Sequence, residues 1–433
     1  MRLADTFAGG SDGAGFKSIG IAVEKPLALA STHSGARRFS LLAVFVASTA
    51  AYCIANVGWW LQPEMLSEVM PRFSVGETQA SWILAAELAA ITLSTLVLAR
   101  FAGRITFARL LIAGLLVILA GQVTSVYATD VRVLLLARLL TGAGEGAALM
   151  ISNAALANFA DPDRAYGQMN MINVAVGAAM TFALPAFAHV LGRPPVFPAI
   201  LFATLLLAPF LVLIPRGLAA DGASQHGDGG SVTSPRSGSL HLGALMLATL
   251  LLGTGSGAVW AFLIEIGRQT PLTITQLNFS VATATLCALL GSGLAALFSV
   301  RAGRLYPFVC GLAALAVADF IITHTTVALT YRIMACVNVG CMYLLLPYLL
   351  GYAAALDHSG RYAAAVASMF LFTGATGPVL GGRLVEAAGI PALGIAVVIV
   401  AVLTLVLVKY VEASLRRVAA TAAASGVASR AGV

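Results

Sequence analysis

The sequence predicts an all-α polytopic membrane protein whose twelve transmembrane helices form two pseudo-symmetric bundles of six. The first observation is composition, because hydrophobic residues make up 59% of the 433 residues and charged residues only 10%, against about 25% charge in soluble domains. The second is a series of apolar runs of about 20 residues, the length that crosses a bilayer as a helix. The third is a repetition of features between the two halves of the chain. The alternating polarity of an outer-membrane barrel is not found.

The N-terminal part of the chain consists of a polar tail followed by six apolar runs. Residues 1–40 are rich in Gly, Ser and Ala and lack the apolar segment and cleavage site of a signal peptide, so we expect a disordered cytoplasmic tail. The N-terminal six-helix bundle is predicted over 41–214, with spans at 41–61, 79–99, 105–127, 131–158, 165–189 and 196–214.

The second half repeats this organisation after a polar interruption. Residues 215–240 are Gly- and Ser-rich, which is typical of a flexible linker, here a cytoplasmic one. The C-terminal six-helix bundle is predicted over 241–411, followed by a cytoplasmic tail over 412–433. Its spans are expected at 241–264, 274–298, 305–322, 327–354, 362–386 and 391–411.

Four features recur in the same order in both halves, the second copy about 200 residues after the first. "ARFAGRI" follows the second span and "SVRAGRL" the eighth. Arg138 lies early in span four and Arg332 early in span ten. The exits of these two spans and the glycines of spans five and eleven also correspond. A duplicated six-helix unit of this kind is a transporter architecture.

The basic residues predict the orientation. They concentrate in the tails and in loops on one side, such as the turns after spans two and eight. The positive-inside rule then predicts that both termini are cytoplasmic. We expect the chain to cross the cytoplasmic (inner) membrane many times.

These motifs resemble the major facilitator superfamily over about residues 40–412. The resemblance rests on the 6+6 arrangement, on the basic turns, and on "RLLTGAGEGA" in span four, which is similar to the family's Arg-x-x-x-Gly-x-Gly element. "GATGPVLGG" (374–382) resembles the Gly-Pro-x-x-Gly-Gly element that drug antiporters usually carry in span five. The resemblance implies cytoplasmic gating turns at Arg100, Gly103, Arg104, Gly303 and Arg304. The chain departs from the family where Arg100 and Val300 replace the usual Asp.

Charged residues within spans are the first candidates for function, because a charge at bilayer depth costs about 2.5–3.5 kcal/mol or more. Glu87, Arg138 and Glu145 are predicted to serve proton coupling at a central cavity. Arg138 and Glu145 are seven residues apart and so share one helix face. The resemblance implies that the span-four arginine faces the cavity and assists coupling. The alternative is a polar face that holds neighbouring helices together, with Glu87 neutral or paired with Arg138.

Asp319 and Arg332 lie near the same ends of adjacent spans and are predicted to form a structural ion pair. The substrate-binding candidates are polar or aromatic residues within the spans: Asn56, Trp59, Asn153, Asn173 and Asn338. Each has a structural alternative, namely a hydrogen bond to a neighbouring helix or, for Trp59, a place in an interfacial aromatic belt.

The function predicted from these features is secondary active transport of a small organic solute by alternating access, with a proton as the expected coupling ion. Drug or metabolite efflux by antiport and uptake by symport both remain open, and a non-transporting sensor or assembly factor is the alternative from another class. We expect no enzyme activity, no metal and no cofactor, since no catalytic or metal-binding spacing is found. The expected partners are the solute, the proton and the lipid bilayer, with no nucleic acid, and we expect a monomer.

Overall fold

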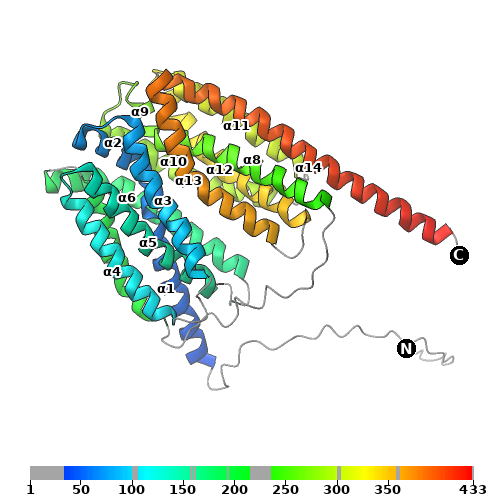
Figure 1. Cartoon of the computed structure of the whole chain (residues 1–433), viewed down its shortest axis with the longest axis horizontal. Helices are drawn as coiled ribbons and strands as arrows, with labels where there is room; N and C mark the ends of the chain where they lie inside the picture. Colours follow the sequence, from blue (N-terminus) through cyan, green and yellow to red (C-terminus); the bar gives the residue numbers. More distant parts are fainter. Residues whose placement is uncertain are drawn as a thin grey trace, which may run out of the picture. The chain divides into compact units, whose positions relative to one another are not determined.

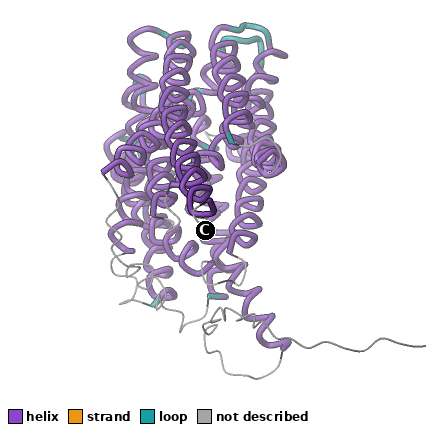
Figure 2. The backbone as a smooth tube through the Cα atoms, turned by 90° about the vertical axis from the view of Figure 1, so that its right-hand side faces the viewer, coloured by secondary structure: helices purple, strands orange, loops and turns teal. Residues whose placement is uncertain are grey.

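The computed structural model describes residues 34–99, 106–156, 159, 162–192, 195–214, 236–299, 304–356 and 361–431. The chain divides into two compact units, Met1–Leu41 and Leu42–Val433, and the packed helices belong to the second. Within the described residues, twelve helices are long and apolar enough to span a membrane, and no strand is present (Figure 2). The predicted fold class is confirmed.

Seven helices make up the N-terminal half (Figure 1). Six of them contribute the membrane spans: α1 (Ser34–Trp60), α3 (Glu77–Ala99), α4 (Phe107–Tyr127), α5 (Val131–Leu156), α6 (Pro162–Leu191) and α7 (Val196–Leu207). The last of these continues as a 3-10 segment over Ala208–Leu213. The seventh, α2 (Gln62–Phe73), is short and lies between the first two spans.

The C-terminal half has the same plan (Figure 1). Its spans are α8 (Arg236–Ala261), α10 (Ile274–Ser299), α11 (Leu305–His324), α12 (Ala328–Leu356), α13 (Arg361–Ala388) and α14 (Pro391–Ala431). A short helix, α9 (Leu263–Gly267), follows the first of them. Each half therefore places a short extra helix directly after its first span.

Three helices extend into the predicted tails and linker. Helix α1 begins at Ser34 and α8 at Arg236, inside the predicted tail and linker, and α14 continues to Ala431 through the predicted C-terminal tail. The extension of α14 is rich in alanine, the residue with the highest helix propensity, so the backbone continues the helix beyond the apolar run.

The outer faces of the spans are apolar. Large hydrophobic side chains are exposed on several helices, for example Leu93, Leu116, Leu290 and Val402. Helices satisfy their own backbone groups, so such a surface suits contact with lipid, where an unsatisfied polar group is costly.

Helix α2 is the element that hydropathy did not reveal, because its sequence QPEMLSEVMPRF is polar on average. Pro63 at its start suits the first turn of a helix, and Ser74 ends it in a left-handed conformation at φ 52°. Every residue from Gln62 to Val69 is nevertheless buried, because α2 packs against α3, α7, α8 and α9. We call the end of the bundle that carries α2 and α9 the α2 end.

Two long helix pairs join the halves, in addition to the contacts of α2 with α8 and α9. Helix α3 packs along α13, and α6 packs along α10. Helix α3 also packs along α5 within its own half. It therefore contacts both the interior of the N-terminal half and the opposite half.

Candidate functional site

The clearest candidate site is a cluster of three charged residues between α3 and α5. The Arg138 guanidinium is fully buried and pairs with the Glu87 carboxylate, with Nε donating to Oε2 at 3.0 Å and a terminal nitrogen donating to Oε1. The Phe197 ring lies 5.7 Å from the guanidinium carbon, within cation–π range. The pairing of Glu87 with Arg138, one of the sequence-based possibilities, is formed.

Glycines bring the helices close enough for this pair. A Cβ atom on Gly146 of α5 would lie 2.6 Å from the Ile91 carbonyl oxygen of α3, and one on Gly58 of α1 would lie 2.6 Å from Glu87 Oε1. Only residues without a side chain permit such an approach. By helix rise, Glu87 and Arg138 lie about 10–15 Å along their helices from the α2 end.

Glu145 completes the cluster. It is fully buried, and its carboxyl interacts electrostatically with both Glu87 and Arg138. Neither of its oxygens makes a hydrogen bond of ordinary geometry, and one terminal nitrogen of Arg138 also has no partner. One guanidinium therefore faces two carboxyl groups, and the three are electrically neutral together only when one carboxyl holds a proton.

The cluster is enclosed rather than open to water. Arg138 and Glu145 have no exposed surface and Glu87 is 2% exposed. The expectation that these charges look into a watery cavity does not describe this structure, because the close α3–α5 contact covers them. The geometry corresponds to the alternative of a polar contact between helices.

The predicted ion pair between Asp319 and Arg332 is not formed, and this expectation is wrong. Asp319 is fully buried and accepts a hydrogen bond from the Asn338 amide at 2.5 Å, whereas Arg332 is exposed. Residues 332 and 338 are six positions apart on α12, about 240° around the helix. The face that meets α11 therefore carries Asn338, and Arg332 points elsewhere.

The other predicted substrate ligands do not converge on one point. Asn56 donates to the Tyr52 carbonyl of its own helix at 2.8 Å, and the Asn153 carbonyl accepts from the Tyr166 hydroxyl at 2.6 Å. Asn173 is buried with its amide oxygen unpartnered. The Asn338 amide donates its hydrogen bond to Asp319. Trp59 is half-buried and faces the other half.

Aromatic residues close the contact between the halves on the side of the α2 end. The Trp60 ring stacks 5.7 Å from Tyr343 and meets Trp260 edge-on at 6.2 Å. The Trp59 ring lies 6.3 Å from Phe370, and the Trp260 indole donates to the Trp59 carbonyl at 3.2 Å.

Polar contacts between the halves also lie at the α2 end. The Thr78 hydroxyl donates to Glu386, and Arg268 donates to the Ser67 hydroxyl at 2.8 Å. Together with the aromatic contacts, they make the α2 end a closed contact between the halves.

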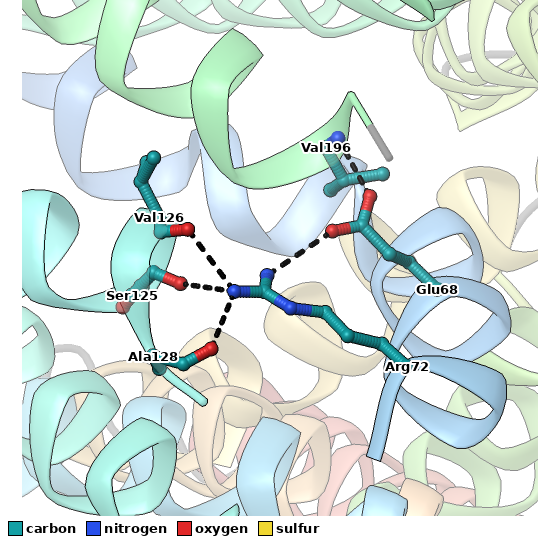
Figure 3. A network of polar contacts seen from close by, with 6 residues as sticks. All are labelled: Glu68, Arg72, Ser125, Val126, Ala128 and Val196. Atoms are coloured by element: carbon teal, nitrogen blue, oxygen red, sulfur yellow. Dashed lines mark hydrogen bonds and ion pairs between the residues drawn. The ribbon is translucent and has the colours of Figure 1, made fainter. Parts of the chain in front are cut away.

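A polar network that was not predicted from the sequence holds α2 in place (Figure 3). Arg72 donates to the carbonyl oxygens of Ser125, Val126 and Ala128 at 3.2, 3.0 and 2.8 Å, at the end of α4. Glu68 Oε1 lies 3.5 Å from Arg72 Nη1. Glu68 Oε2 accepts a hydrogen bond of 2.8 Å from the backbone N–H of Val196 at the start of α7.

Both contacts use backbone groups that a helix end leaves unpaired, with charges that suit the helix dipoles. The signal in the sequence was Glu68 and Arg72 at i,i+4 spacing in a segment that hydropathy alone assigns to a loop.

Most of the predicted gating turns, Arg100, Gly103, Arg104 and Gly303, lie outside the described residues. Arg304 is exposed at the start of α11. Over the described part of the chain, no group of three His, Cys, Asp or Glu side chains is placed to hold a metal ion.

Comparison with known proteins points to one family. A sequence model of the Major Facilitator Superfamily matches residues 28–237. No curated protein sequence matches the chain. Among solved structures, the chain is similar to a point mutant of the nucleoside transporter NupG, with a TM-score of 0.67 at 13% identity over 86% of this chain and 99% of that one.

It is also similar to a bacterial homologue of the human lysosomal transporter Spinster, solved in inward-facing occupied and unoccupied conformations. The TM-scores are 0.65 and 0.64 at 16% and 15% identity, over 89% of this chain and 98% of those. At these identities the likeness concerns the fold.

Proposed function

The chain belongs to the major facilitator superfamily, and on that premise we propose that it is a proton-coupled secondary transporter of a small organic solute. The family and the fold support transport of small solutes across a membrane. The observation that carries the proton is the buried cluster of one guanidinium and two carboxyl groups on α3 and α5.

Alternating access requires the halves to separate where they now meet. Two glycines of "GATGPVLGG" on α13, Gly374 and Gly382, lie in this contact. A Cβ atom on Gly374 would lie 2.9 Å from Leu88, and one on Gly382 would lie 2.5 Å from Ser81 and 2.8 Å from the Glu77 carbonyl oxygen. The absence of side chains at these glycines lets α13 lie against α3, so this is the surface that opens.

Helix α3 connects this contact to the charged cluster. Glu87 faces Arg138 on α5, while its neighbour Leu88 faces Gly374 on α13. A proton that moves onto Glu87 removes the charge that holds Arg138, and α3 is then free to shift against α5. Such a shift also changes the α3–α13 contact, which provides the coupling between the proton and the opening.

Glu145 is the group we assign to hold the exchangeable proton, because its carboxyl is buried with no hydrogen-bond partner of ordinary geometry. When Glu87 takes up a proton from solution on one side, Glu145 releases its own proton to the other side and becomes the partner of Arg138, so one proton enters the cluster for each that leaves. The cluster then remains neutral in both states, which avoids an unpaired charge in the membrane.

The solute is expected between the halves, beside the half-buried Trp59, which lies in the aromatic contact. Uptake by symport and efflux of a drug or metabolite by antiport use the same cluster and differ in the direction of net flux. We further propose a cytoplasmic-membrane location with both termini cytoplasmic, which makes the α2 end the outer one.

The test begins with a thermal-shift screen of the purified protein against metabolites and drugs, since a solute that binds the folded state stabilises it. Flux of each hit is then measured in proteoliposomes with an imposed pH gradient. We expect a pH-gradient-driven flux whose sign gives the direction. Coupling that survives in both Glu87→Gln and Glu145→Gln contradicts the assigned site. Absence of flux for every hit contradicts transport and favours a sensor or assembly factor.

A further inference from the structure

A second candidate site lies at the α2 end, and none of the three charged residues of the cluster lines it. A cavity of about 390 Å³ opens there between α2, α6, α7, α9 and α10. Exposed Pro71, Arg268 and Ile274 mark its rim. The residues at its base are buried, with Glu64 3% and Asn278 7% exposed.

The charges that line this cavity are compensated except for one. Arg72 is held by Glu68 and by three backbone carbonyls. Arg268 pairs with Glu265 at 3.0 Å and donates to Ser67 at 2.8 Å. Glu64 makes no ion pair with any described residue.

The polar atoms at the base also lack partners. No side chain in the described part of the chain donates a hydrogen bond to either carboxyl oxygen of Glu64, and the Asn278 amide oxygen is likewise unpartnered. A buried carboxylate without a partner is costly. The base of the cavity thus presents three acceptor oxygens that water or a ligand has to satisfy.

We propose that this cavity binds a small organic ammonium ion, with its ammonium group on Glu64 and Asn278. An ammonium group has three N–H donors and no acceptor, which matches the acceptor oxygens of the base. The apolar part of the ligand packs on Val196, Ile264 and Ile274, which line the same cavity. The arginines do not recruit an anion in its place, because both are already paired.

The ligand competes with a proton for Glu64. Burial raises the pKa of the Glu64 carboxyl to about 8, against a smaller lowering by its own backbone N–H. The charged and titratable groups around it are Glu68 and Arg72 on α2, Glu265 and Arg268 on α9, and Tyr331 on α12. At neutral pH the proton largely occupies the site, so binding of the ammonium ion releases it to solvent.

The experiment titrates the full-length protein in lipid nanodiscs with n-butylammonium, followed by ligand-observed NMR, with 1-butanol as the uncharged control of the same shape. We expect the Kd for n-butylammonium to fall about tenfold or more between pH 6.5 and pH 8.5, as Glu64 ionises across its pKa. We expect no saturable binding of 1-butanol.

Two variants and a control locate the site. Glu64→Gln keeps the shape of the buried side chain and should lose binding at both pH values, and Asn278→Leu should weaken it. Glu77→Gln, at the start of α3 outside the cavity, should bind as the unmodified protein does. Equal binding of 1-butanol, a pH-independent Kd, or unchanged binding to Glu64→Gln overturns the proposal. The test measures binding alone, so its outcome does not depend on whether the protein transports.

Discussion

The two halves share a helix plan but treat their charges differently. Arg138 lies early in α5, fully buried and paired with Glu87. Arg332 lies early in α12, the repeat-related helix, and is exposed. The buried acid of the C-terminal half, Asp319, meets the neutral Asn338 instead of a cation. The comparison teaches that the two halves share their helix plan, whereas among the described residues the buried ionic cluster lies in the N-terminal half.

The largest expected difference in stability is between replacement of Arg138 and replacement of Arg332. Arg138→Ala leaves Glu87 buried beside Glu145 with no cation, and loss of one partner of a buried pair costs about 3–5 kcal/mol. Arg332→Ala removes an exposed side chain and should change stability by no more than about 0.5 kcal/mol. Denaturant unfolding in mixed micelles measures both. Equal losses would show that the halves do not differ as described.

Glycine substitutions should have opposite signs at the tight α3–α5 contact of the N-terminal half and at an open position on α10 of the C-terminal half. Gly146→Ala places a methyl group against the α3 backbone, and overpacking of this kind costs about 1–3 kcal/mol. Gly293 of α10 has open space around it, so Gly293→Ala should be neutral or stabilise by up to about 1 kcal/mol through helix propensity. Thermal melts of both variants check this. A Gly146→Ala protein as stable as the unmodified one contradicts the close contact.

A smaller effect is expected in the pH dependence of stability, which should differ between the glutamates of α2 and α9. Glu64 on α2 is unpaired, and burial raises its pKa to about 8, whereas Glu265 on α9 pairs with Arg268. A carboxyl whose pKa is raised by folding gives stability that is fully present below its unfolded pKa and is lost as pH rises through 8.

We therefore expect the unmodified protein to lose Tm relative to Glu64→Gln between pH 5 and pH 8.5, by on the order of a few °C. Glu265→Gln serves as the control at a carboxyl that is paired with Arg268. Parallel pH profiles for the unmodified and Glu64→Gln proteins would show that Glu64 ionises as freely as an exposed acid.

The fold was predictable from the sequence because the hydropathy of a segment directly indicates whether it forms a helix surrounded by lipid. Twelve runs of sufficient length give twelve spans, and "RLLTGAGEGA" placed Glu145 and Arg138 on a helix packed through glycine. Helix α2 was not predicted because its composition is polar. Its burial comes from contact with other helices and from the Arg72 and Glu68 contacts to helix ends, which hydropathy does not detect. The Asp319–Arg332 pair failed because proximity along two helices does not determine which face each side chain occupies.

The most direct test of the account is proton movement in proteoliposomes loaded with a pH-sensitive dye, recorded when a transported solute is added. Glu145→Gln and Asp319→Asn change one buried carboxyl each, in opposite halves. We predict that Glu145→Gln reduces solute-dependent proton movement at least tenfold, while Asp319→Asn stays within about twofold of the unmodified protein. Loss of proton movement in Asp319→Asn together with full retention in Glu145→Gln would contradict the assignment of coupling to the N-terminal cluster.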